Sequence, residues 1–135
     1  MHALRTYDYA VVRVVPRVER GEFVNAGIIL SCDTERILLA SIELDEKALL
    51  ALDARVDLDL VRNVLASIPT VCAGGEAAGD IGKMSARERF HWLVAPRSTI
   101  VQTSPVHTGR CADPDAALAH LMQTMVRRSG SAQPV

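Results

Sequence analysis

The stretch that decides the fold is residues 9–30, YAVVRVVPRVERGEFVNAGIIL. Residues 9–15 are rich in β-branched and aromatic side chains and residues 23–30 are mostly apolar, as in strands that pack within a sheet. Pro16 ends the first run because it cannot donate a ladder hydrogen bond, and Gly21 allows the turn. The stretch therefore predicts two antiparallel strands joined by a short turn.

Alternation along a strand sorts its side chains onto two faces of the sheet. On the second strand this places one set of residues opposite another: Phe23, Asn25, Gly27 and Ile29 against Val24, Ala26, Ile28 and Leu30. Both faces are largely apolar, so we expect the hairpin to be central and covered on both sides. Arg13 and Asn25 are polar exceptions, and each needs a partner, because an unsatisfied buried polar group costs about 1–3 kcal/mol.

These polar residues have two interpretations. Gly27 marks either a β-bulge or a point where another group approaches the backbone closely. Arg13, Glu22 and Asn25 form either a structural polar network or a binding site, because both produce similar signatures. In either case we expect the three side chains to lie in one connected network.

The rest of the chain alternates helical and strand patterns. Residues 37–42 predict a third strand that completes a meander, and residues 98–103 predict a fourth. Helix starts are expected at Asp45, at Asp57, at a capping box formed by Ser85 and Glu88, and at Asp113 followed by Pro114. The fold class is therefore α+β, with an antiparallel sheet of about four strands and helices packed on it.

Three further segments complete this description. Pro69 is expected to end or kink the second helix near Ile68. Residues 73–83 are expected to be a glycine-rich linker, because a phosphate loop would end in Gly-Lys-Ser/Thr. Residues 104–113 are expected to be a loop. The whole is one domain over residues 1–128, with a disordered tail at 129–135.

Composition limits the compartment and the partners. The net charge of −1 gives no general attraction to nucleic acid or to an anionic membrane. The first residues lead into a charged strand pattern instead of a signal peptide, and no apolar run reaches the roughly 18–20 residues of a membrane span. The three cysteines, Cys32, Cys72 and Cys111, are too widely spaced for a disulfide framework. We expect a cytoplasmic protein with reduced thiols.

No familiar catalytic or metal-binding pattern is present. Cys-x-x-Cys and His-x-x-x-His are both missing, so no metal and no cofactor are expected. His107 and Cys111 share a segment, but a nucleophilic pair also needs hydrogen-bond contact and an orienting group. Arg13, Arg17, Arg20 and Arg97 either converge on a phosphate or acidic partner or lie on separate surfaces. The candidate site residues are Arg13, Glu22, Asn25, Gly27, Arg97 and His107.

Several motifs together resemble one known family. They are Tyr9, Arg13 and Pro16 followed by GEFVNAG at 21–27, RERFHWL at 87–93, APRS at 95–98, SPV at 104–106, Gly109 and Cys111. This pattern resembles the bacterial domain of unknown function 3037 family over nearly the whole chain, to about Arg127. The resemblance implies no established activity, cofactor or catalytic residue. It does imply a genomic association with HipA-like kinases, which makes such a kinase a candidate partner.

Two functional hypotheses follow. The first is a non-enzymatic protein-interaction or accessory module. The second is a small enzyme acting on a phosphate-bearing or nucleic-acid substrate through Arg13, Glu22, Asn25, Arg97 and His107. The lack of a recognisable nucleophile or metal set favours the first hypothesis.

Overall fold

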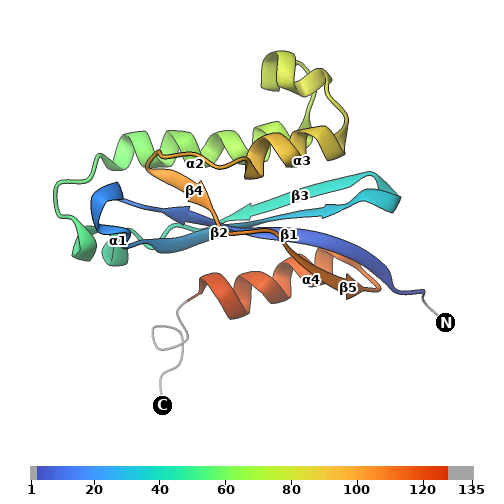
Figure 1. Ribbon diagram of the computed structural model, residues 1–135, viewed down its shortest axis with the longest axis horizontal. Coiled ribbons are helices and arrows are strands. Elements are labelled where there is room, and N and C mark those ends of the chain that lie inside the picture. Colours follow the sequence, from blue (N-terminus) through green and yellow to red (C-terminus); the bar gives the residue numbers. More distant parts are fainter. Residues whose placement is uncertain (1–2, 128–135) are drawn as a thin grey trace.

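A computed structural model describes residues 3–127, and the predicted tail at 129–135 lies outside these residues. Its centre is a five-stranded antiparallel sheet (Figure 1). The strands are β1 (Arg5–Val14), β2 (Val24–Cys32), β3 (Ile37–Ile42), β4 (Val101–Thr103) and β5 (His107–Cys111). They lie in the order β3-β2-β1, and β4 and β5 share the remaining edge of β1. The α+β class and the predicted meander are thus confirmed.

The fifth strand corrects the prediction of a loop at 104–113. β5 pairs with the first half of β1, in a register that sets Gly109 opposite Tyr7. A Cβ on Gly109 would lie 2.6 Å from the Tyr7 ring, so the glycine makes room for the aromatic side chain. The segment escaped sequence analysis because His107, Thr108 and Arg110 are polar and no apolar alternation marks the strand. The predicted strand at 98–103 is also shorter, since only its last three residues pair with β1.

Helices begin where the capping residues predicted. They are α1 (Glu46–Leu52), α2 (Leu58–Ala73), α3 (Ala86–Val94) and α4 (Pro114–Leu121), which a π-helical turn extends to Val126. The Asp45 carboxylate accepts a 3.0 Å hydrogen bond from the Ala48 amide. Ser85 and Glu88 form the expected capping box. Each cap satisfies amides that the first helical turn leaves without a partner.

The predicted end of this helix near Ile68 is wrong, because α2 continues through Pro69 to Ala73. Proline in a helix interior costs about 3 kcal/mol. The residues beyond it offset this cost, since Val71 and Cys72 are both buried in the core that α2 shares with the sheet. The free energy gained by burying these apolar side chains therefore exceeds the cost of Pro69 inside the helix.

The glycine-rich segment is also more ordered than a linker. Residues Glu76–Lys83 form short 3₁₀ turns that project beyond the ends of α2 and α3 (Figure 1). A hydrogen bond of 3.1 Å from the Gly75 amide to the Gly82 carbonyl closes the segment. A Cβ on Gly82 would overlap the Gly75 carbonyl, so this closure requires glycine.

Helices cover the sheet on both faces, as predicted for a central hairpin. α2 and α3 lie on one face and α4 on the other (Figure 1). The larger core includes Val12, Val14, Leu65 and Phe90, and the smaller one, under α4, includes Val11 and Met122. Within residues 3–127, no helix is both long enough and apolar enough to cross a membrane.

Candidate functional site

A β-bulge interrupts the hairpin at its most polar point. Val12 pairs with Gly27 and Arg13 pairs with Asn25, which leaves Ala26 as the extra residue. A Cβ on Gly27 would lie 2.5 Å from the Ser41 carbonyl oxygen of β3. Both features expected of Gly27 are therefore present. It lies at a β-bulge, and the group that approaches its backbone closely is the backbone of β3.

The bulge also changes which face each residue of β2 occupies. Val24 and Ala26 pack in the same core as Ile29, beneath α2 and α3. Ile28 and Leu30 pack in the other core, on the α4 side. The predicted grouping of Val24 and Ala26 with Ile28 and Leu30 is therefore wrong, because an extra residue reverses strand alternation.

Arg13 and Asn25 face each other across the bulge with incomplete hydrogen bonding. The Arg13 guanidinium lies 4.2 Å from the centre of the Phe23 ring. Asn25 donates a 3.0 Å hydrogen bond from Nδ2 to the Met125 carbonyl, which ties β2 to the end of the C-terminal helix. The Arg13 Nε and the Asn25 Oδ1 are buried and have no hydrogen-bond partner among residues 3–127. A donor and an acceptor at this bulge are thus left unsatisfied by the described residues.

Among residues 3–127, no hydrogen bond or ion pair joins Glu22 to Arg13 or Asn25, and none joins Arg13 to Asn25, so the expected three-residue network is not formed there. The Glu22 carboxylate accepts hydrogen bonds of 2.6 and 3.2 Å from Arg20 at the hairpin tip. The hydrogen bond from Arg20 lowers the pKa of Glu22, and the charges of Arg20 and Arg17 add to this effect. Both partners are exposed, so the pair orders the tip without adding much stability.

Arg97 and His107 lie elsewhere and have local roles. Arg97 donates from Nη1 to the Leu93 carbonyl at 3.0 Å and from Nη2 to the Trp92 carbonyl at 2.6 Å. It therefore caps the C-terminus of α3, where a cation is favourable. His107 is exposed on β5, with its ring 5.5 Å from that of Tyr9.

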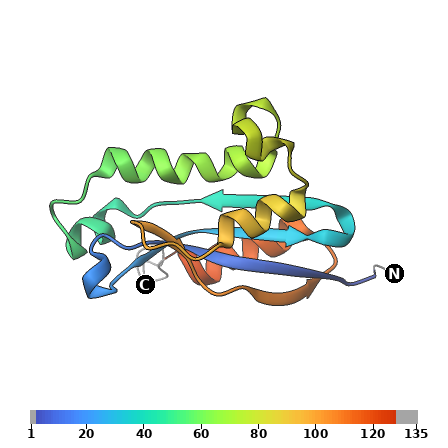
Figure 2. The same ribbon diagram turned by 45° about the horizontal axis from the view of Figure 1, so that its top comes forward.

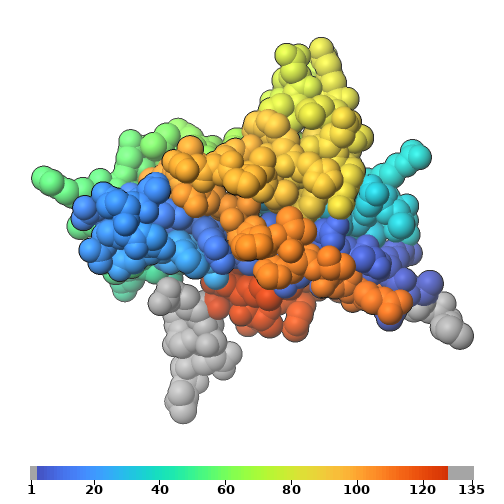
Figure 3. All heavy atoms as spheres, in the orientation of Figure 1, coloured from blue at the N-terminus to red at the C-terminus, as the bar shows by residue number. Residues whose placement is uncertain are grey.

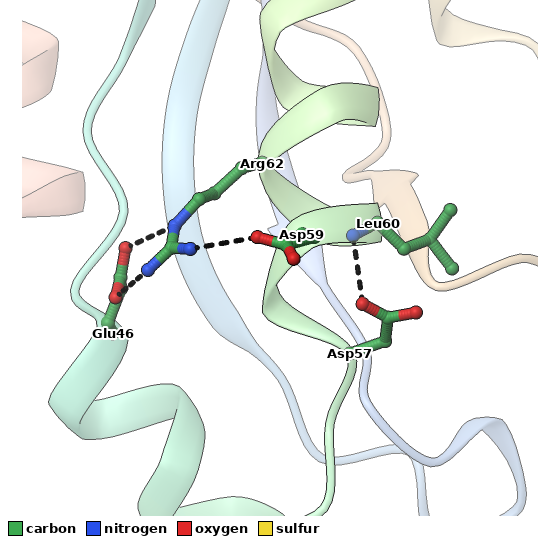
Figure 4. A network of polar contacts seen from close by, with 5 residues as sticks. All are labelled: Glu46, Asp57, Asp59, Leu60 and Arg62. Carbon is green, nitrogen blue, oxygen red and sulfur yellow. Dashed lines mark hydrogen bonds and ion pairs between the residues drawn. The ribbon is translucent and has the colours of Figure 1, made fainter.

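The arginines named in the sequence do not form one cluster of uncompensated charge. Arg17 Nη2 lies 3.5 Å from Glu19 Oε2, and Arg20 forms an ion pair with Glu22. Figure 4 shows a similar arrangement between α1 and α2, where Arg62 of α2 binds Glu46 and Asp59. The carboxylates neutralise these guanidinium groups, which weakens the case for a phosphate site at the hairpin tip.

Sequence analysis missed a polar network that joins four elements. Arg87 of α3 donates to Asp8 Oδ2 of β1 at 2.8 Å and to Ser31 Oγ of β2 at 3.0 Å. Thr108 of β5 donates to Asp8 Oδ1 at 2.7 Å. In the sequence, the one sign of this network is a charged residue, Asp8, between two tyrosines of a strand. Its partners Arg87 and Thr108 are 79 and 100 residues away, so local patterns do not reveal them.

This network has a clear electrostatic consequence. Partial burial acts to raise the pKa of Asp8, but hydrogen bonds from Thr108 and Arg87, with the Arg87 charge, outweigh it. The pKa of Asp8 is consequently lowered, and the carboxylate stays charged at neutral pH. The network thereby joins α3 to three strands.

The thiols and histidines offer little for nucleophilic or metal chemistry. Burial raises the pKa of Cys72 to about 12, which suppresses its thiolate. His107 and Cys111 sit at the two ends of β5, roughly 13 Å apart at the usual strand rise. That separation is too great for a catalytic pair. Among residues 3–127 no three His, Cys, Asp or Glu side chains are grouped to hold a metal ion.

Comparisons with known proteins assign the chain to one family. Neither the curated proteins nor the solved structures include a match to the chain. One family model does match, and it covers residues 9–126, from the middle of β1 to the end of the C-terminal helix. The chain therefore belongs to the family described as protein of unknown function (DUF3037).

Proposed function

We propose that this chain is a protein-interaction module that binds an extended segment of a partner along the outer edge of β3. The observation that carries this proposal is the edge itself. β3 reads ILLASI, contains neither a charged residue nor proline, and pairs only with β2 among the described strands. Exposed strand edges are usually protected by charges, proline, bulges or short length, because they recruit other strands. The other outer edge is different, since β4 has three residues and β5 carries His107 and Arg110.

The register between β2 and β3 determines which backbone groups of β3 face outward. The Glu43 amide donates to the Ala26 carbonyl at 2.8 Å, and Ile42 pairs with Gly27. Because backbone groups alternate sides along an antiparallel strand, Leu39 and Ser41 then point toward β2. The amides and carbonyls of Leu38, Ala40 and Ile42 point outward, where a partner strand could bind them.

The position of α2 favours a separate segment over a second copy of the chain. Among the strands, α2 packs mainly on β3, and Figure 2 shows the two running side by side. Antiparallel edge-to-edge pairing of two copies would set the β3 strands about 4.8 Å apart, with both α2 helices on the same face. Packed helices need about 8–10 Å between axes, so these helices would collide. An extended segment without a helix on that face avoids the collision.

A second contact is proposed at the hairpin tip. Arg17 and Arg20 lie there with Val18, which is 50% exposed. Because their ion pairs with Glu19 and Glu22 are exposed, reversing the two arginine charges should leave the fold intact. If the partner extends beyond β3 to the tip, the same change should weaken association.

The experiment compares two variants of Ala40. Ala40→Pro removes one outward amide and keeps the inward ladder to β2, whereas Ala40→Ser keeps the amide and serves as the matched control. A HipA-like kinase is the first purified partner to test, followed by proteins captured from the native host. We expect wild type and Ala40→Ser to bind the same partner and Ala40→Pro to lose it, while circular dichroism shows all three folded. Bound partner should also slow hydrogen exchange at Leu38, Ala40 and Ile42.

Two results would contradict the proposal. One is a bound partner that leaves those three amides exchanging as fast as in the free protein. The other is turnover of a phosphoester or nucleotide by the wild type that is abolished by His107→Ala or Glu22→Ala, which would support the enzyme hypothesis instead.

A further inference from the structure

We infer that the pocket beside Trp92 and Arg97 binds a small apolar carboxylate. This site is distinct from the β3 edge, because it lies between α2, α3 and β4. Its volume is about 180 Å³. A second depression of about 280 Å³ adjoins it, and the two share Arg97, Gln102 and Thr103 in their walls. Figure 3 shows the orange segment that contains β4 crossing the front of the molecule below the yellow α3.

The walls of the smaller pocket are mainly apolar. α2 contributes Val64 and Ile68, α3 contributes Trp92 and Leu93, and β4 contributes Val101. Trp92 is 40% exposed, although a large aromatic side chain gains by burial. An apolar ligand in the pocket would remove part of this ring from water, which supplies a favourable contribution to binding.

Charge sets the second property of the ligand. Of the described residues that line the two depressions, only Arg97 is charged. Among residues 3–127 it has no ion-pair partner, and its two known hydrogen bonds go to neutral carbonyls. A guanidinium carries five N–H groups, so three remain for a ligand. The guanidinium carbon of Arg97, Cζ, lies 4.5 Å from the centre of the Trp92 ring, and this contact restricts the orientation of the guanidinium group.

These features select one class of ligand. A carboxylate matches a single guanidinium in charge and geometry, whereas a phosphate dianion would leave a negative charge against apolar walls. The volume is below the roughly 300–1,000 Å³ of pockets for drug-sized molecules, so the apolar group is small and compact. A cyclic or branched aliphatic monocarboxylate satisfies both conditions.

The chain provides its own probe, because Trp92 is the only tryptophan. The full chain is titrated with cyclohexanecarboxylate, and with cyclohexanecarboxamide as the uncharged analogue of the same shape. Tryptophan fluorescence should change saturably with the acid, and the amide should bind at least about tenfold more weakly, as expected when one charge-assisted hydrogen-bonding group is lost. Arg97→Gln should weaken binding of the acid to the level of the amide. Arg62→Gln, a change to a surface arginine outside the pocket, should leave binding unchanged.

A second variant covers the risk that Arg97→Gln disturbs the end of α3. Ser67 lines the pocket from α2 and is exposed, so Ser67→Leu narrows the cavity and leaves Arg97 in place. This variant should keep its circular dichroism spectrum and lose binding. The inference is overturned by equal binding of acid and amide, by unchanged binding in a folded Ser67→Leu variant, or by no saturable change at millimolar acid.

Discussion

Replacing Gly27 by alanine tests the account of the bulge most directly. Gly27 does not have a positive φ, so the alanine backbone is unstrained there. The obstacle is β3, since the new Cβ would lie 2.5 Å from the Ser41 carbonyl oxygen and 2.6 Å from Ile42 Cδ1. The Ile42 atom ends a flexible side chain and can move. The Ser41 oxygen belongs to the paired backbone and can move only with its strand.

The expected loss of stability follows from these two contacts. Forcing an extra carbon into a packed site costs about 1–3 kcal/mol. Separating β3 from the bulge also threatens the 2.8 Å hydrogen bond from the Glu43 amide to the Ala26 carbonyl, worth about 0.5–1.5 kcal/mol. Gly27→Ala should therefore destabilise the fold by about 2–4 kcal/mol, a large part of the roughly 5–15 kcal/mol typical of a domain. The melting temperature should fall by roughly 10 °C.

Urea unfolding, followed by circular dichroism, measures this free energy. Gly21→Ala is the control, because Gly21 has a φ of 70° and a Cβ added to it would have nothing within 4 Å, so only the left-handed backbone costs energy. Ile42→Val removes Cδ1 and should rescue only part of the Gly27→Ala loss. Gly27→Ala being no more harmful than Gly21→Ala, or full rescue by Ile42→Val, would refute the proposed clash with the Ser41 carbonyl.

Three other predictions concern polar and thiol groups. Asn25→Ala should lower the free energy of unfolding by about 1–3 kcal/mol in urea unfolding, because it removes the hydrogen bond to the Met125 carbonyl. Asp8→Asn should flatten the acid dependence of stability: the lowered pKa of Asp8 stabilises the wild type above about pH 4, and this contribution is lost as pH falls through that pKa. Native alkylation read by mass spectrometry should modify half-buried Cys111 before Cys32 and Cys72, and elemental analysis should find no stoichiometric zinc.

Local signals in the sequence predicted much of the fold correctly. The boundaries of β3 follow directly from the run ILLASI between Arg36 and Glu43. The capping box of Ser85 and Glu88 starts α3 as expected, because both partners lie within one helical turn. Such features depend on neighbours in sequence, so a single chain is enough to identify them.

Three of the failures share a different cause, which is a partner distant in sequence. β5 is recognised by pairing with β1, and Gly109 in it makes room for Tyr7. The bulge reverses the faces of β2 through its register with Arg13. Arg87 finds Asp8 only after α3 has packed on the sheet. No local periodicity contains this information, and tertiary contacts decide each case.

Three of the six predicted site residues have side-chain hydrogen-bond partners within residues 3–127, and Arg13 is not among them. Glu22 accepts a hydrogen bond from Arg20 at the hairpin tip, and Asn25 donates one to the Met125 carbonyl of the C-terminal helix. Arg97 donates to the Leu93 carbonyl at the end of α3. The contact of Arg13 with the Phe23 ring contributes about 0.5–1 kcal/mol at an exposed site, while leaving a buried donor unpaired costs about 1–3 kcal/mol. The contacts within residues 3–127 therefore do not offset the burial of its Nε. Arg13 is the candidate residue whose identity folding explains least, and it lies directly opposite Asn25, whose buried Oδ1 also has no hydrogen-bond partner among residues 3–127.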